Sequence, residues 1–177
     1  MLPRPRGPLS ARVLALLTGS SAPSPERTLG ADPLTDDDLH LALYCCYELH
    51  YRGFDGVDPA LEWDPELLAL RGRMESVFER ALRDETAPAE TLDAGTVGGW
   101  LWRYVDGLSG PSLSGYMAAE GTLDELREFA VHRSAYQLKE ADPHSFALPR
   151  VWGPAKSALV EIQADEYGGG RPGQTHA

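Results

Sequence analysis

Apolar residues recur along this chain at the spacing of an α-helix, and polar or helix-breaking residues separate one repeat from the next. The clearest stripe lies at Leu39, Ala42, Leu43, Cys46 and Leu49, which places five apolar side chains on one helix face. No segment shows the strict alternation that is typical of a half-buried strand. The pattern therefore predicts an all-α protein.

Residues around this stripe predict where its helix begins and ends. Thr35 can cap a helix, and three aspartates follow it at 36–38, where carboxylates favour the positive end of the helix dipole. Gly53 is a typical helix stop, so we expect the helix to run to about Arg52.

A second strong start signal is Thr122 with Glu125 three residues later, which forms a capping box. This helix is expected to run to about Glu140, and Asp142-Pro143 ends it. With the same reasoning elsewhere, the expected helices span residues 9–18, 35–52, 65–84, 96–106, 112–119, 122–140 and 154–167.

Two parts of different composition follow from this pattern. Residues 1–34 are expected to hold a short helix and a loop rich in Pro, Gly and Ser, and residues 35–177 a helical domain. A polar linker is expected at residues 86–95.

Charge and cysteine content narrow the class of protein. The formal net charge is −11, with 27 acidic against 16 basic residues, which argues against a nucleic-acid or anionic membrane surface. No apolar run reaches the length of a membrane span or of a secretory signal. Cys45 and Cys46 are adjacent inside an apolar helical run, so we interpret them as reduced core thiols of a cytoplasmic protein.

The candidate chemistry lies near residue 177. Glu166 ends an acidic helix, three glycines follow, and His176 comes ten residues after Glu166. On one unbroken helix the two side chains would be about 80° apart around the axis. The glycines at 168–170 permit a bend that brings them to one point. Carboxylate and imidazole are ligands of non-haem iron, so the pair is a candidate metal site. The alternative is a frayed tail with an isolated histidine.

Other potential ligands are easier to explain without a metal. They are Glu161 with Asp165, Glu128 with His132, Glu48 with His50, and the loop residue His144. The first two pairs are spaced i,i+4 and share a helix face, which suits a solvated surface as well as a metal. The third pair is two residues apart and points to opposite sides of a helix, so it cannot chelate one ion.

Several segments resemble the iron-containing redox enzyme family, the haem-oxygenase-like non-haem di-iron oxidases. The similarity extends from residue 8 to residue 177. The order of the matching segments along the chain is what makes the match specific. The segments that carry it are residues 41–44, 47–54, 132–144 and 159–172, followed by His176.

The resemblance implies a haem-oxygenase-like helical bundle around non-haem iron. Family members supply a Glu and a His a short distance apart, then another Glu and a later His-x-x-x-Asp-x-x-His pattern. Glu166 and His176 match the first pair, and the later ligands have no counterpart before Ala177. The resemblance therefore implies the front part of a bundle, incomplete at the C-terminus and cut before the remaining ligands.

The implied chemistry is O₂ activation and oxidation of a small organic substrate once the site is completed. A bundle cut after its front helices would leave apolar faces without partners, so the chain is expected to self-associate or to be stabilised by a C-terminal fragment that carries the remaining ligands. The alternative is a helical structural or protein-interaction domain without catalytic activity.

Overall fold

The structure, a computed structural model, describes residues 1–21, 32–86 and 92–176. Within these ranges the regular structure is helical throughout and contains no strand, which confirms the predicted all-α fold. The chain divides into two compact units, Met1–Asp93 and Ala94–Ala177. The domain boundary predicted after residue 34 lies within the first unit, and this boundary stays a prediction.

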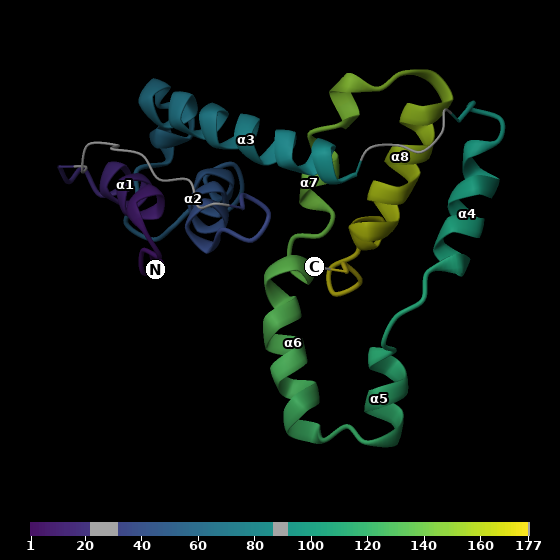
Figure 1. Ribbon diagram of the computed structural model, residues 1–177. Coiled ribbons are helices and arrows are strands. Elements are labelled where there is room, and N and C mark those ends of the chain that lie inside the picture. The colour runs from purple at the N-terminus through teal and green to yellow at the C-terminus, as the bar shows by residue number, and fades with distance from the viewer. Residues whose placement is uncertain (22–31, 87–91, 177) are drawn as a thin grey trace. The chain divides into compact units, whose positions relative to one another are not determined.

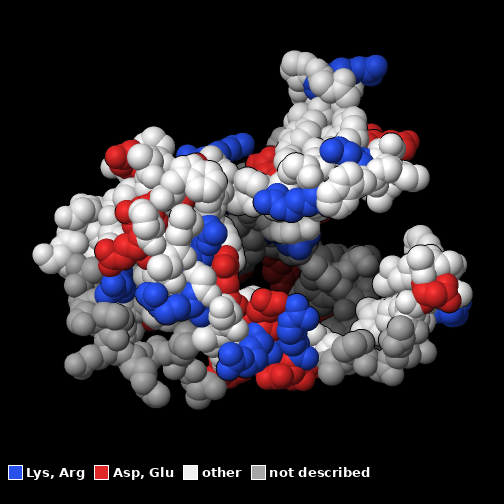
Figure 2. Space-filling view, turned by 90° about the horizontal axis from the view of Figure 1, so that it is seen from above, with Lys and Arg blue, Asp and Glu red and all other residues white. Residues whose placement is uncertain are grey.

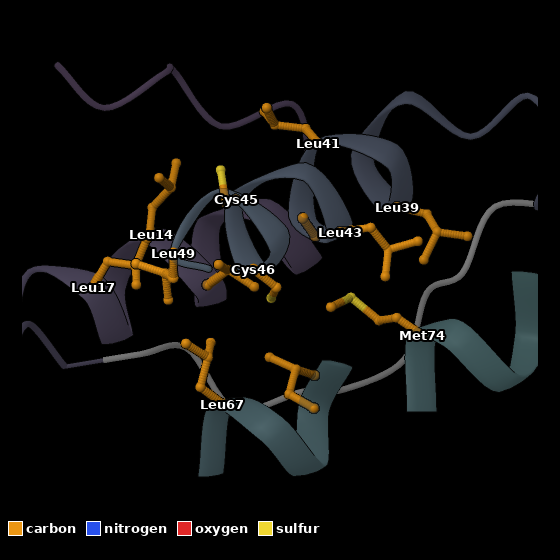
Figure 3. Close-up of a cluster of buried hydrophobic side chains, with 13 residues drawn as sticks. Leu14, Leu17, Leu39, Leu41, Leu43, Cys45, Cys46, Leu49, Leu67 and Met74 are labelled. Carbon is orange, nitrogen blue, oxygen red and sulfur yellow. The ribbon is translucent and has the colours of Figure 1, made fainter. Parts of the chain in front are cut away.

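Unit 1 is built around the apolar stripe of its second helix. Its helices are α1 (Pro8–Leu17), α2 (Asp37–Glu48), the 3₁₀ helix η1 (Pro59–Trp63) and α3 (Pro65–Glu85) (Figure 1). Both α1 and α3 contact α2. Figure 3 shows Leu67 and Met74 of α3 facing the side chains of α2. Leu39, Ala42 and Cys45 have no exposed surface, so α2 is the centre of this core.

A buried carboxylate joins the first two helices. Asp38, in the first turn of α2, is 8% exposed and accepts hydrogen bonds from the backbone N–H groups of Leu9 and Ser10, both at 2.8 Å. The hydroxyl of Ser10 donates to the same carboxylate. These donors lie in the first turn of α1, where N–H groups have no partner within the helix. Asp38 therefore caps α1 from a different part of the chain.

The ends of α2 differ from those expected. Asp36, not Thr35, is the capping residue, and its side chain accepts hydrogen bonds from the backbone N–H groups of Asp38 and Leu39. The helix ends at Glu48 instead of near Arg52, because the next residues form tighter turns. Gly53 is still the stop: its φ is +65°, and its N–H donates to the carbonyl of Glu48 at 2.9 Å.

Unit 2 holds the remaining helices. They are α4 (Val97–Gly107), α5 (Leu113–Ala119), α6 (Leu123–Gln137), α7 (Asp142–Ser145), the 3₁₀ helix η2 (Leu148–Arg150), α8 (Gly153–Glu166) and the 3₁₀ turn η3 (Gly168–Gly170) (Figure 1). The capping box of Thr122 and Glu125 is present. However, α6 ends at Gln137 rather than near Glu140, and Asp142-Pro143 begins α7 instead of only ending a helix.

The two units differ in how much they bury. Among the described residues of unit 2, only Ala141 and Gln163 are buried. Several large apolar side chains of α4, α5 and α6 are at least two-fifths exposed, for example Leu101, Tyr116 and Phe129. Unit 1 therefore has a closed core, and unit 2 presents apolar surface.

Charged side chains of both signs are mixed. On the face shown in Figure 2, Lys and Arg lie among Asp and Glu. Arg12 pairs with Glu66 at 2.8 Å, and Arg127 pairs with Asp124 at 2.9 Å. Across the described ranges, no helix is both long enough and apolar enough to cross a membrane.

Candidate metal centre

Glu166 and His176, the pair singled out in the sequence, meet in the structure. Glu166 is the last residue of α8, and the chain after it turns back past the helix end (Figure 1). Nδ1 of His176 lies 2.9 Å from Oε2 of Glu166. The backbone N–H of His176 also donates to the carbonyl oxygen of Glu166 at 2.9 Å. Two contacts therefore hold the imidazole against the carboxylate.

The glycines make this return of the chain possible. Gly168, Gly169 and Gly170 have φ values of +64°, +60° and +74°, a region that other residues adopt at a cost. At Gly168 space is also restricted, because a Cβ there would lie 2.5 Å from the carbonyl carbon of Gln174. The bend expected from the glycines is present, and Gly168 is where the returning backbone comes closest.

One oxygen of the site lacks a hydrogen bond. Oε2 of Glu166 is buried and accepts none within the part of the chain that the structure describes, although His176 Nδ1 faces it at ion-pair distance. The Glu166 side chain is 21% exposed, and the His176 side chain is 53% exposed. A buried carboxylate oxygen without a donor is costly unless a cation compensates it.

The spacing of the two atoms suits a shared ion. Cis ligands of an octahedral ion, each at about 2.1 Å from it, lie about 3 Å apart, and the observed distance is 2.9 Å. An ion pair with a protonated His176 has the same spacing and would also compensate this oxygen, so the geometry suits a shared cation and a direct ion pair equally. No third His, Cys, Asp or Glu of the described ranges converges with them closely enough to hold a metal.

A further carboxylate, Glu140, acts on a tyrosine that Glu166 also influences, and the sequence reasoning missed it. The pKa of Tyr136 is raised, mainly by the charge of Glu140 and a hydrogen bond to it, and also by the charge of Glu166. The Tyr136 hydroxyl is therefore within electrostatic reach of both carboxylates. Glu140 itself is held by Gln137, whose amide donates to it at 2.8 Å. Glu140 lies beyond the end of α6 and forms no ligand pattern with its neighbours, so no signal in the sequence pointed to it.

The other predicted ligand pairs of unit 2 are surface residues. Glu128 and His132 are 3.6 Å apart, with both side chains about three-quarters exposed. Glu161 and Asp165 are exposed on α8. His144 has a partner that the sequence did not indicate, since its Nδ1 lies 3.2 Å from Oε1 of Gln163.

His50 belongs to a polar network in unit 1 and does not join Glu48 at a site. Its Nδ1 lies 2.7 Å from Oε1 of Glu62, and its Nε2 contacts the guanidinium of Arg71. Because the guanidinium can only donate, Nε2 accepts and Nδ1–H donates to Glu62. The network thus ties η1 to α3 beside the end of α2.

The adjacent cysteines are free and buried, as expected. Burial raises the pKa of Cys45 to about 11 and that of Cys46 to about 12. Both thiols are therefore protonated and unreactive at neutral pH.

Comparison with known proteins locates a family similarity in unit 2. Residues 127–177 match the family model described as iron-containing redox enzyme. This match covers less than half of the chain, and it includes Glu140, Glu166 and His176. No curated protein and no solved structure matches the chain. The resemblance expected from the sequence is thus confirmed over residues 127–177, where the chain is similar to the iron-containing redox enzymes.

Proposed function

We propose that this chain contributes part of a non-haem iron centre, mononuclear or di-iron, to an O₂-activating oxidase or oxygenase. The observation that carries the proposal is the convergence of Glu166 and His176 around a buried carboxylate oxygen without a hydrogen bond. The match of residues 127–177 to iron-containing redox enzymes supports iron as the metal. A mixed carboxylate and imidazole donor set is that of non-haem iron, whereas haem needs an axial ligand only.

Each residue has a defined task in this proposal. Glu166 supplies negative charge to balance the cation. The nitrogen of His176 that faces Glu166 is Nδ1, so its proton has to reside on Nε2 for Nδ1 to ligate. Iron bound there would supply the reduction of O₂ coupled to oxidation of a small organic substrate.

Two ligands are too few to hold iron tightly, so the site needs further groups. Glu140 is a candidate for a further ligand, since it and Glu166 both act on Tyr136. We propose that it turns toward the ion when the site fills. The remaining ligands would come from a further segment or a second copy. The buried free thiols support a reducing compartment, and we propose the cytoplasm.

Metal binding to single variants tests the proposal. Fe(II) should bind the chain weakly under anaerobic conditions, and Glu166→Ala and His176→Ala should each abolish that binding. Matched controls are Glu161→Ala on α8 and His132→Ala on α6, which should bind as wild type does. The chain alone should consume no O₂ with iron present. Equal binding by wild type and Glu166→Ala would refute the assignment.

A second function is favoured by one observation, the exposed apolar faces of α4, α5 and α6. Exposed apolar patches mark interaction surfaces. In that case the chain is a helical interaction domain without catalysis. The same metal titration separates the two functions, because an interaction domain binds no iron through Glu166 and His176.

A further inference from the structure

Gln163 is a buried polar side chain on α8, only 5% exposed. Its amide nitrogen donates to the carbonyl oxygen of Ala141 at 2.9 Å and to the hydroxyl of Ser145 at 3.0 Å. Its Oε1 lies 3.2 Å from Nδ1 of His144. Burying an amide is favourable only when its polar atoms are paired, and here both ends have partners.

These partners connect the two carboxylates of the candidate site. Ala141 directly follows Glu140, and Gln163 precedes Glu166 by three residues, which places both α8 side chains on one face of the helix. The amide thus joins the backbone beside Glu140 to the helix turn before Glu166. The hydroxyl of Tyr167, which follows Glu166, adds a second link by donating to Asp142 at 2.8 Å.

We infer that Gln163 is a positioning residue for the iron centre, and this inference rests on the function proposed above. Its amide fixes the start of α7 against α8, and so holds the backbone beside Glu140 against the helix that carries Glu166. Loss of the amide lets Glu140 move away while α8 itself remains folded. Residues that orient metal ligands in this way typically contribute about 10- to 100-fold to metal affinity.

Gln163→Met tests this role, because methionine keeps the length of the side chain and removes the amide. We expect its Fe(II) affinity to fall at least tenfold, and the visible spectrum of bound Co(II) to change as one carboxylate is lost. Tyr167→Phe removes the second link at an exposed position and should change both readouts in the same direction. Glu161→Ala, at an exposed position of the same helix, is the matched control and should bind metal as wild type does.

Circular dichroism melting of each variant shows whether the helices persist. If Gln163→Met melts as wild type does and binds Fe(II) and Co(II) unchanged, the positioning role is refuted. If its helices are lost, an unchanged Co(II) spectrum in Tyr167→Phe refutes the role instead. The Glu166→Ala variant separates failure of the positioning role from failure of the proposed function. If Glu166→Ala also binds Fe(II) as wild type does, the iron site itself is wrongly assigned.

Discussion

A Cβ atom on Gly168 would lie 2.5 Å from the carbonyl carbon of Gln174, closer than any real methyl group approaches a backbone. The returning segment therefore crosses the helix end at Gly168, where no side chain blocks its path. The same backbone path brings His176 to Glu166, with their nearest side-chain atoms 2.9 Å apart. Tight packing at Gly168 and the geometry of the candidate ligands are consequences of one turn.

Gly168→Ala should separate the two candidate ligands. The methyl group meets backbone that cannot move aside without opening the turn, and the left-handed φ adds about 1–2 kcal/mol. We expect Fe(II) binding as weak as in His176→Ala, with the melting temperature of the chain little changed. Isothermal titration under anaerobic conditions measures the affinity.

Gly169→Ala is the matched control for this prediction. It has a similar φ of +60°, but a Cβ there has open space around it. This variant tests the cost of the left-handed φ without a collision of the Cβ atom. Its Fe(II) affinity should therefore fall by much less than that of Gly168→Ala. Equal losses in the two variants would mean that the close approach to Gln174 is unimportant.

Asp38→Ala should destabilise unit 1. The substitution leaves the N–H groups of Leu9 and Ser10 without their acceptor, and buried hydrogen bonds to a charged group contribute about 1.5–3 kcal/mol each. Because water can satisfy part of the exposed helix end, we expect a net loss of about 3 kcal/mol in the free energy of unfolding. Urea denaturation followed by circular dichroism measures it.

Asp37→Ala serves as the control for Asp38. Its side chain is 81% exposed and lies 3.4 Å from Arg6, a surface pair of little energetic value. A change below about 0.5 kcal/mol is expected. If both variants lose the same stability, the capping of α1 by Asp38 does not matter.

The two buried thiols make stability depend on alkaline pH. In the unfolded chain they ionise near their ordinary value of 9.0, whereas in the fold burial raises the pKa of Cys45 to about 11 and of Cys46 to about 12. Between pH 9 and 11 the unfolded chain therefore loses protons that the folded chain keeps. It follows that the free energy of unfolding decreases as pH rises through this window.

The measurement is urea denaturation at pH 8 and pH 10.5. A chain carrying both Cys45→Ala and Cys46→Ala should lose less stability between these two pH values than wild type does, by at least about 1 kcal/mol. A parallel decrease in the two proteins would show that other groups cause the pH dependence.

Local signals explain which features the sequence predicted. The stripe on α2 and the capping box at Thr122 are set by residues close in the sequence, and both are found. The end of α2 was misplaced because His50 bonds to Glu62 and Arg71, which lie far along the chain. At the candidate site, the glycines at 168–170 predicted the bend of the chain between Glu166 and His176. Gln163 was missed because its partners belong to α7 and its N-cap, and Glu140 was missed because it forms no ligand pattern with its neighbours in the sequence.

The apolar surface of unit 2 leads to the last prediction. The side chains of Phe129, Leu138 and Ile162 are 40%, 55% and 50% exposed. Leu159, which is on α8 with Ile162, is half-buried. Water around such side chains favours association. We expect the chain to self-associate at micromolar concentration, and Leu138→Glu with Ile162→Glu to weaken this at least tenfold. Sedimentation velocity measures it, with Leu82→Glu on α3 as an exposed control.

If the proposed iron site is completed from outside the chain, a fragment of a family member that supplies further Glu and His ligands should compete for the same surface. Because it would cover apolar side chains and add ligands, mixing should raise both the melting temperature and the iron content of the chain. Binding of a partner to the folded state stabilises it in proportion to the logarithm of partner concentration. If the chain is monomeric, melts cooperatively alone and ignores the fragment, the proposal that its iron site is completed from outside the chain is refuted.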